Sequence, residues 1–347
     1  MFALPDQGAA IGGRPASLAE AAAAAATLLR GAACPVIAGL RTDAAGASAA
    51  AALARRLDAV LDHAESEAAS CDFAAMQAAG WIVATPLLAR ARADVFFIVG
   101  DGHAEAWPEF AERLALDRPP TLDAGQTPRR VVRLGPGSDL TARLGMLRVL
   151  VKRRPIAAPA AFTALAEALR GARYGVAIWS AAHLPALAID MLCGLIDDLN
   201  ATTRFAGLPL PSGGNAAGVA QALGWETGFP FRVAFRDGVP RHDPWRYDAR
   251  RMVDSGEADA ALWLDALGGL PPSWQAPVRL VALAPSGARF PAAPDVAITV
   301  GRPGIDHAAA LFDPAAAALR AVGPAMPQGA PAAAFVLGRI TAAIGPC

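Results

Sequence analysis

Short, strongly apolar runs alternate with longer alanine-rich or amphipathic segments along most of this chain of 347 residues. The apolar runs have the length of buried strands, and the segments between them are long enough for helices. Strands that alternate with helices in this way form parallel sheets covered by helices on both faces. The sequence therefore predicts an α/β protein with doubly wound parallel sheets, arranged in two or more Rossmann-like layered units.

The expected strands and helices can be placed along the chain with few ambiguities. We expect strands over residues 35–40, 95–100, 131–134, 174–179, 260–264, 279–283 and 296–300. The clearest helix start is Ser17, because Glu20 follows three residues later and completes a capping box. Helices are expected over residues 17–30, 46–61, 139–152, 159–169 and 184–199, with a last helix that ends near Ile344.

Two proline-rich regions indicate how these elements are grouped. The stretch Pro155–Pro159 suggests a boundary, so we expect a first α/β unit over residues 1–155 and a second over residues 156–347. The segment 207–240 is rich in glycine and proline and is too long for an ordinary connection in an α/β fold. A helix should open near Asn215 within it, but we interpret the segment as a functional or interface loop.

The composition excludes several classes of function. The formal net charge is zero, so there is no basic surface to predict nucleic-acid binding. No apolar stretch reaches the roughly 18 residues that span a bilayer, and no signal peptide precedes the first helix, so we expect a cytoplasmic protein. Charged residues make up only 18% of the chain, against about 25% in ordinary domains. Either alanine enrichment or burial against other protein chains would explain this low fraction.

The cysteines and histidines do not form a recognisable metal motif. The chain has four cysteines, Cys34, Cys71, Cys193 and Cys347, and no two of them form a CxxC pair. Zinc and iron–sulfur sites usually take at least one such pair from a short loop. The five histidines are far apart in the sequence and form neither an HxH nor an HxxxH pair.

Two polar segments are candidates for a functional site. Asp101 and His103 follow the strongest predicted strand, at the sheet edge where doubly wound proteins bind ligands. They are suited to acid–base or metal chemistry, although a polar turn at a strand end is the simpler interpretation. Asn215 opens a helix that leads into a block of glycines and aromatic residues. Such a block indicates backbone that packs closely against a ligand or another chain, or within the protein itself.

This block carries a resemblance to a known family. The runs Asn215-Ala216-Ala217-Gly218, Gly224-Trp225-Glu226-Thr227-Gly228-Phe229-Pro230-Phe231 and Asp237-Gly238-Val239-Pro240-Arg241 resemble the tungsten/molybdenum subunit, or B subunit, of formylmethanofuran dehydrogenases. They are most similar to its degenerate homologue in the bacterial formyltransferase/hydrolase complex. The resemblance extends from about Ser17 to Ala321 and implies the fold of a truncated molybdopterin-oxidoreductase large subunit. Within the block, we take Trp225, Glu226, Phe229 and Arg241 as candidates for contacts with partner chains.

The chain departs from that family where the chemistry resides. The catalytic members begin with cysteines for a [4Fe–4S] cluster, and no cysteine precedes Cys34 here. Their metal-ligating cysteine lies in a C-H-G-P turn, whereas the corresponding region reads Asp62-His63-Ala64-Glu65, with Cys71 displaced downstream. Their G-C-N-P turn has become Gly100-Asp101-Gly102-His103, and their R-G-H-Y-N stretch has become Pro211-Ser212-Gly213-Gly214-Asn215.

The resemblance and these departures together imply a structural role. We expect no catalytic residue, no metal and no cofactor in this chain. The expected partners are an amidohydrolase-like A subunit, a C subunit and a formyltransferase subunit, in tetrahydromethanopterin-linked oxidation of formaldehyde to formate. One alternative is an active molybdopterin oxidoreductase whose metal is bound by Cys71 or His103. Another is a module that binds a methanofuran-type carrier through a vestigial pocket with Asp101, His103 and Asn215.

Overall fold

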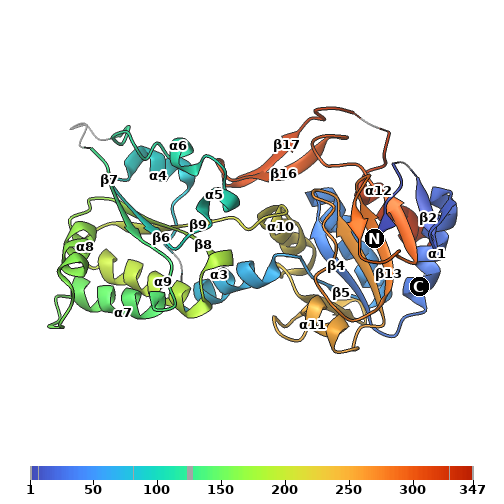
Figure 1. Cartoon of the computed structure of the whole chain (residues 1–347), viewed down its shortest axis with the longest axis horizontal. Coiled ribbons are helices and arrows are strands. Elements are labelled where there is room, and N and C mark those ends of the chain that lie inside the picture. The colour runs from blue at the N-terminus through green and yellow to red at the C-terminus, as the bar shows by residue number, and fades with distance from the viewer. Residues whose placement is uncertain (1, 7, 81, 123–127, 328, 346–347) are drawn as a thin grey trace. The chain divides into compact units, whose positions relative to one another are not determined.

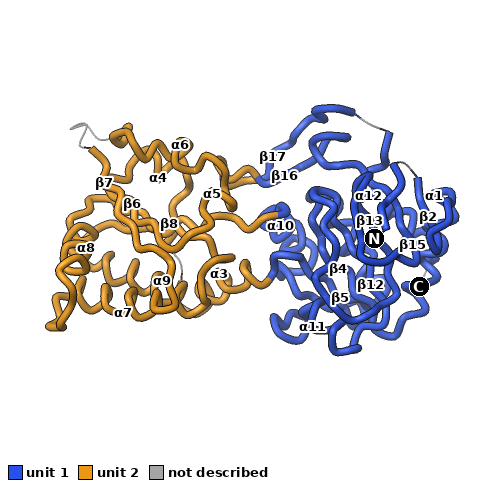
Figure 2. The backbone as a smooth tube through the Cα atoms, viewed as in Figure 1, with its two compact units in different colours: residues 1–66, 214–312, 319–347 blue, residues 67–213, 313–318 orange. Residues whose placement is uncertain are grey.

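The computed structural model describes residues 2–6, 8–80, 82–122, 128–327 and 329–345, and it has the expected α/β architecture. The chain forms two compact units (Figure 2). Unit 1 comprises residues 1–66, 214–312 and 319–347, and unit 2 comprises residues 67–213 and 313–318. Among the described residues, no helix is long and apolar enough to cross a membrane.

This division differs from the boundary that we expected near residue 155, because that position lies inside unit 2. The strand β8 (Gly175–Ser180) pairs in parallel with β6 (Val95–Val99), which lies well before the expected boundary. Hydrogen bonds of one sheet therefore join the two halves that the proline-rich stretch separates in sequence. Pro155–Pro159 is only the connection between two neighbouring helices of unit 2.

Unit 1 is built on a nine-stranded mixed sheet with the strand order β11-β10-β5-β4-β12-β13-β15-β2-β3. The five central strands run parallel, and the outer strands pair antiparallel at both ends. The strands are β2 (Ala9–Ile11), β3 (Arg14–Ala16), β4 (Pro35–Arg41), β5 (Val60–Leu61), β10 (Val233–Arg236), β11 (Val239–His242), β12 (Ala260–Asp265), β13 (Arg279–Ala284) and β15 (Val296–Thr299).

The helices of unit 1 pack against this sheet and against one another (Figure 1). They are α1 (Leu18–Arg30), α2 (Ala44–Leu57), α10 (Ala216–Thr227), α11 (Ala249–Asp254) and α12 (Ala333–Ile344). The capping box at Ser17 is confirmed, since its hydroxyl accepts the Glu20 N–H and the Glu20 carboxylate accepts the Ser17 N–H. Two small pairs complete the fold, β1 (Phe2–Ala3) with β14 (Arg289–Phe290) and the hairpin β16 (Ala309–Asp313) with β17 (Ala318–Val322).

Unit 2 is a doubly wound four-stranded sheet in which all strands are parallel, in the order β7-β6-β8-β9. Its remaining strands are β7 (Arg130–Leu134) and β9 (Phe205–Leu210). Its helices are α3 (Ser66–Ala79), whose first residue belongs to unit 1, α4 (Pro86–Arg92), α5 (His103–Ala106), α6 (Phe110–Arg113), α7 (Leu140–Val151), α8 (Ala160–Arg170) and α9 (Ala186–Asn200), with a 3₁₀ turn at Ala181–His183.

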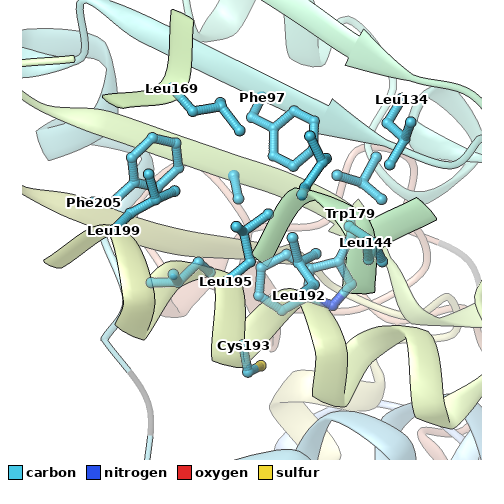
Figure 3. Close-up of a cluster of buried hydrophobic side chains, with 14 of the residues drawn as sticks. Phe97, Leu134, Leu144, Leu169, Trp179, Leu192, Cys193, Leu195, Leu199 and Phe205 are labelled. Atoms are coloured by element: carbon cyan, nitrogen blue, oxygen red, sulfur yellow. The ribbon is translucent and has the colours of Figure 1, made fainter. Parts of the chain in front are cut away.

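The two faces of the unit 2 sheet bury separate hydrophobic clusters, because successive side chains of a strand point to opposite faces. Phe97 and Trp179 pack with α7, α8 and α9 on one face (Figure 3). Phe96 and Ile178 pack with residues around α4 and α6 on the other. Both faces are covered by helices or helical turns, as the alternating sequence pattern predicts.

Two expectations from the sequence are corrected by the structure. The segment 207–240 is not an irregular loop, because it contains most of β9, the whole of α10 and β10 and part of β11. The helix expected over residues 46–61 ends at Leu57, where Asp58 adopts a left-handed conformation with φ of 47°. The chain then turns into β5, which is too short to be recognised by its apolar pattern.

Candidate functional site

The sheet of unit 1 has a topological switch point between β4 and β12, the place where doubly wound proteins bind ligands outside the strand ends. The last residues of these two strands, Arg41 and Asp265, form an ion pair with Nε and Oδ2 3.0 Å apart. Arg41 also pairs with Glu65, with Nη1 and Oε1 3.0 Å apart. Asp265 is completely buried, and its carboxylate accepts N–H groups from Leu267, Gly268 and Leu270. Side chains of the protein therefore occupy this switch point.

The segment around Gly214 lies directly against this ion pair. Gly214 has a φ of 62°, and a Cβ atom there would lie 2.7 Å from Cγ of Arg41, so only glycine fits. Asn215 donates from Nδ2 to the Thr42 carbonyl at 2.7 Å and accepts the Phe312 N–H at 2.8 Å. The side chain that we proposed for a vestigial pocket is thus hydrogen-bonded to backbone groups of unit 1 at both of its ends.

His63 completes this side of the site. Its Nδ1 accepts the Glu65 N–H at 3.0 Å, so Nε2 carries the proton and donates to the Gly214 carbonyl at 3.1 Å. Burial lowers the pKa of His63 to about 4, and the positive charge of Arg41 acts in the same direction, against the hydrogen bond to Gly214. The imidazole is therefore neutral near pH 7 and acts as a structural hydrogen-bond donor.

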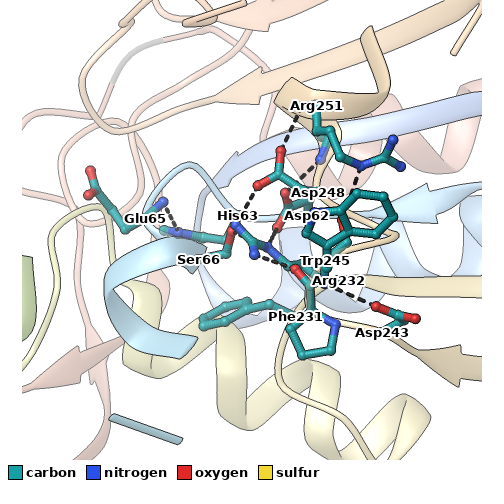
Figure 4. A network of polar contacts seen from close by, with 12 residues as sticks. Asp62, His63, Glu65, Ser66, Phe231, Arg232, Asp243, Trp245, Asp248 and Arg251 are labelled. Carbon is teal, nitrogen blue, oxygen red and sulfur yellow. Dashed lines mark hydrogen bonds and ion pairs between the residues drawn. The ribbon is translucent and has the colours of Figure 1, made fainter. Parts of the chain in front are cut away.

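A second polar cluster of unit 1 is centred on the buried guanidinium of Arg232 (Figure 4). Its Nη2 lies 2.6 Å from Oδ2 of Asp248, its Nε donates to Ser66 Oγ at 3.2 Å, and its Nη1 donates to the Pro244 carbonyl. Asp62 is farther away, with Oδ1 3.7 Å from Nε of Arg232. Arg232 has a φ of 51°, a strained backbone state that the surrounding contacts must hold in place.

Asp62 stands in the region that corresponds to the metal-ligating turn of the catalytic family, and its environment is unusual for a carboxylate. Its Oδ2 accepts the Ala249 N–H at 2.9 Å. Burial raises the pKa of Asp62 to about 7, although the Arg232 charge and hydrogen bonds from Ser66 and Ala249 oppose this shift. Because the effect of burial outweighs the attraction of the Arg232 charge, the Asp62 carboxyl group holds a proton at slightly acidic pH.

In unit 2 the switch point lies between β6 and β8, and His103 fills it. The ring is buried, and its Nε2 is 3.1 Å from the carbonyl of Val99, the last residue of β6. Burial lowers the pKa of His103, against the effect of that hydrogen bond. Its ring also packs on Phe110, with the ring centroids 5.6 Å apart. The structure therefore places this histidine in the interior of unit 2, while Asn215 belongs to unit 1.

Asp101 is the exposed member of the predicted pair. Its Oδ1 is 3.6 Å from Nδ1 of His183, and Glu105 approaches Nε2 of the same ring at 3.3 Å. Gly102, with a φ of 71°, lies beneath the ring, where a Cβ would be 2.0 Å from Cδ2 of His183. His183 was not among our candidates, although it follows β8 just as Asp101 follows β6, and that parallel position is the signal that could have identified it.

The predicted contact residues do not share one environment. Trp225 is 73% exposed at the end of α10, and Glu226 and Arg241 are also exposed. Phe229 is half-buried and stacks on His242, with centroids 5.3 Å apart and planes 14° apart. Large exposed aromatic and arginine side chains are typical of protein interfaces, so Trp225 and Arg241 remain candidates for that role.

The residues present do not fit a metal–pterin centre. Among the described side chains, no group of three or more histidines, cysteines and carboxylates is placed to hold a metal ion. Burial raises the pKa of Cys34, and it raises the pKa of Cys193 to about 12, which disfavours the thiolate form that metals bind. Cys71 lies on α3 and packs against the hydrophobic cluster of unit 2. Cys347 lies outside the described residues.

These observations define a class of protein, a two-unit α/β chain with one mixed and one parallel sheet, in which side chains of the protein itself lie at the switch points of both sheets. No family model matches the sequence. The chain is 34% identical over 318 residues to the B subunit of the formyltransferase/hydrolase complex Fhc of Methylorubrum extorquens, and the match covers 87% of each protein. The chain belongs to this family of B subunits.

More distant relatives and a solved structure agree with this assignment. The B subunit of the tungsten-containing formylmethanofuran dehydrogenase 2 of Methanocaldococcus jannaschii is 27% identical over 242 residues, which cover 60% of this chain and 55% of that protein. The fold matches a chain in the crystal structure of the formyltransferase/hydrolase complex FhcABCD from Methylorubrum extorquens, solved with methylofuran. That match has a TM-score of 0.86 and 32% identity, and it covers 97% of this chain and 98% of the other.

Proposed function

We propose that this chain is a non-catalytic, metal-free structural subunit of a formyltransferase/hydrolase complex. The complex would act in the tetrahydromethanopterin-linked oxidation of formaldehyde to formate. The observation that carries the proposal is the Arg41–Asp265–Glu65 network at the switch point of unit 1. Doubly wound proteins bind cofactors at that edge of the sheet, whereas here Arg41 lies there, paired with the buried Asp265 and the partly exposed Glu65.

The residues in the region of the lost ligand turn support the same interpretation. Asp62 stands in this region, where it is buried, accepts the Ala249 N–H and lies near Arg232. A carboxyl group held in this way supplies no thiolate to a metal. Iron–sulfur relays in redox enzymes require clustered cysteines, and Cys34, Cys71 and Cys193 lie in separate elements or connections. These cysteines form no disulfide, which fits the cytoplasmic location that we propose.

The proposed partners are the other subunits of such a complex, namely an amidohydrolase-like A subunit, a C subunit and a formyltransferase subunit. The relative of known structure lies in a complex of this kind. Exposed apolar side chains such as Trp225 and Leu87, which are 73% and 66% exposed, are expected to be covered by these partners.

A role as a carrier-binding module has less support. Of its three candidate residues, His103 bonds to the Val99 carbonyl and Asn215 bonds to Thr42 and Phe312, so both polar groups serve the fold. Only Asp101 is exposed, and its carboxylate faces the His183 ring.

Expression of the complex with and without this chain tests the proposed function. We expect the other subunits to keep their formyl-transfer and hydrolysis chemistry when each is assayed alone, but to fail to assemble stably without this chain. We also expect an interface above roughly 2,000 Å², as in obligate complexes. A stable, monodisperse monomer on solo expression, together with normal assembly of the remaining subunits in its absence, would contradict the proposal.

A further inference from the structure

The turn of residues 243–247 links β11 to α11 in unit 1 and carries an exposed tryptophan. Trp245 is 72% exposed, although the turn is anchored at Tyr247, whose ring is buried in a hydrophobic cluster with Met252. A single exposed ring is ordinary in proteins, but the way in which this turn is held is not.

Arginine side chains bind three successive carbonyl groups of this turn (Figure 4). Arg232 donates from the interior, with its Nη1 bonded to the Pro244 carbonyl. Arg251 of α11 donates from Nε to the Trp245 carbonyl at 3.1 Å and from Nη2 to the Arg246 carbonyl at 2.5 Å. Two arginines therefore fix the backbone around the exposed ring.

The indole of Trp245 is held as well. The guanidinium of Arg251 lies over it, with Cζ 4.6 Å from the ring centroid, and an ion pair of 2.8 Å with Glu257 keeps this arginine in place. The N–H of Trp245 donates to Oδ1 of Asp243 at 3.0 Å. Because a side chain that is already fixed loses little conformational entropy on binding, the turn is preorganised to serve as an anchor.

The charges around Trp245 indicate what kind of surface would cover it. The segment 241–251 contains four arginines and two aspartates. Both aspartates are engaged within unit 1, since Asp243 accepts backbone N–H groups and Asp248 pairs with a buried guanidinium. Arg241 and Arg246 are exposed, and neither enters an ion pair with any residue that the structure describes. A complementary surface has an apolar pocket for the indole and carboxylates at its rim.

The neighbouring strand β11 does not favour a different mode of binding. It is the outermost strand of the nine-stranded sheet, where a partner could add a strand. Pro240 lies opposite Phe235 within these four residues and has no N–H to donate. Pro240 therefore interrupts the ladder that an added strand would need, which leaves side-chain contacts at the adjacent turn.

We propose that the turn of residues 243–247 is a docking site for another subunit of the complex. Trp245 enters an apolar pocket of that subunit, and Arg246 faces carboxylates at the rim of the pocket. This inference rests on the proposed function, because it takes the partner to be a subunit of the same complex. Buried tryptophan and arginine side chains dominate the binding energy of protein interfaces. Arg232 and Arg251 are positioning residues, since they hold the turn.

A photo-crosslinking amino acid identifies the molecule that covers the turn. With p-benzoylphenylalanine in place of Trp245, the purified and assembled complex is irradiated and the crosslinked peptides are sequenced by mass spectrometry. We expect a crosslink to another subunit, in a peptide that contains aspartate or glutamate. A crosslink to a second copy of this chain, or none, would overturn the docking site.

Release of this chain from the diluted complex, followed by mass photometry, measures the strength of the contact. Trp245→Ala should raise the dissociation constant about 30-fold or more, as at an interface hot spot, and Trp245→Phe less than about 10-fold. Arg251→Met leaves the indole in place but frees the turn, so it should raise the constant about 5-fold. Unchanged hydrogen exchange of β10 in both Trp245 variants would show that the fold is intact.

Charge reversal tests the rim. Arg246→Glu should raise the dissociation constant about 10-fold at low salt and less at high salt, where charges are screened. Arg14→Glu is a matched control, because it reverses an exposed arginine in β3, at the opposite end of the same sheet. It should leave the constant unchanged, and equal effects of the two variants would overturn the carboxylate rim.

The outcomes separate the docking site from the proposed function. A dissociation constant of the Trp245→Ala complex that matches the wild type would overturn the docking site and leave the structural role intact. An unchanged constant for Arg251→Met would overturn the positioning role of that arginine. Normal assembly of the other subunits in the absence of this chain would instead contradict the proposed function.

Discussion

Substitution of Arg232 by methionine tests whether Asp248 or Asp62 carries the negative charge that balances the buried guanidinium. Methionine has a similar length and backbone preference, so the change chiefly removes charge and hydrogen bonds. Removal of one partner from a buried ion pair costs about 3–5 kcal/mol. Because the Asp248 side chain is 23% exposed and partly hydrated, we expect about 3 kcal/mol, near the lower end of that range.

The second substitution in each double variant distinguishes the two carboxylates. Asp248→Asn should recover about 1–2 kcal/mol in the Arg232→Met background, because it removes an unpaired charge. It also keeps the N-cap of α11, where Asp248 accepts the Arg251 N–H at 2.7 Å, since asparagine caps equally well. Asp62→Asn should recover less than about 0.5 kcal/mol at pH 6, because burial raises the Asp62 pKa to about 7 and its carboxyl group is already protonated.

Hydrogen exchange measured by mass spectrometry on the assembled complex at pH 6 provides the assay. The opening free energy of the peptide that contains β10, the strand that starts directly after Arg232, reports the cost of each variant. A larger rescue by Asp62→Asn than by Asp248→Asn would refute the reasoning, since it would mean that Asp62 carries the balancing charge.

Two further predictions follow from exposure and burial. Trp225→Ala should change the stability of the chain by less than about 0.5 kcal/mol, because the ring is 73% exposed. The same variant should lower the yield of purified complex. Equal yields from variant and wild type would show that Trp225 is not an interface residue. Burial raises the pKa of Asp72 to about 7, so the folded chain holds a proton between pH 4 and 7 that the unfolded chain has released. The contribution of Asp72 to the free energy of unfolding is fully present below pH 4 and is lost as the pH rises through 7. Asp72→Asn keeps an acceptor for Trp179 Nε1, which lies 2.8 Å from Oδ1 of Asp72. Between pH 5 and 8, denaturation curves should therefore show a smaller loss of stability for this variant than for the wild type. Parallel pH profiles of the two proteins would contradict the raised pKa of Asp72.

The elements of the fold could be predicted from the sequence where burial is uniform along a strand or helix. β6 and β12 are buried at every position, and their apolar runs indicate this directly. β5 escaped prediction because it has only two residues and is defined by its partners β4 and β10. The grouping into units could not be predicted either, because it depends on pairing between strands that are distant in the sequence.

The candidate site could be predicted only in part. The sheet edge was recognised at Asp101 and His103, yet their roles depend on side-chain direction, which is inward for His103 and outward for Asp101. Arg41 and Asp265 were missed because we ended the two strands at the preceding leucines, one residue before the charged pair. Arg232 was missed although an arginine between Phe231 and Val233 in an apolar run is a signal for a buried charge that needs a partner.

The metal content of the purified complex tests the central claim most directly. Elemental analysis should find no stoichiometric tungsten, molybdenum or iron attributable to this chain, because Asp62 stands in the region of the ligand turn and the partly buried Cys34 and the buried Cys193 have raised pKa values. A formate:dye oxidoreductase assay on the wild type and Cys71→Ser should show no activity that depends on this thiol. One equivalent of tungsten or molybdenum per chain, or dye reduction that disappears with Cys71→Ser, would contradict the account and restore the oxidoreductase alternative.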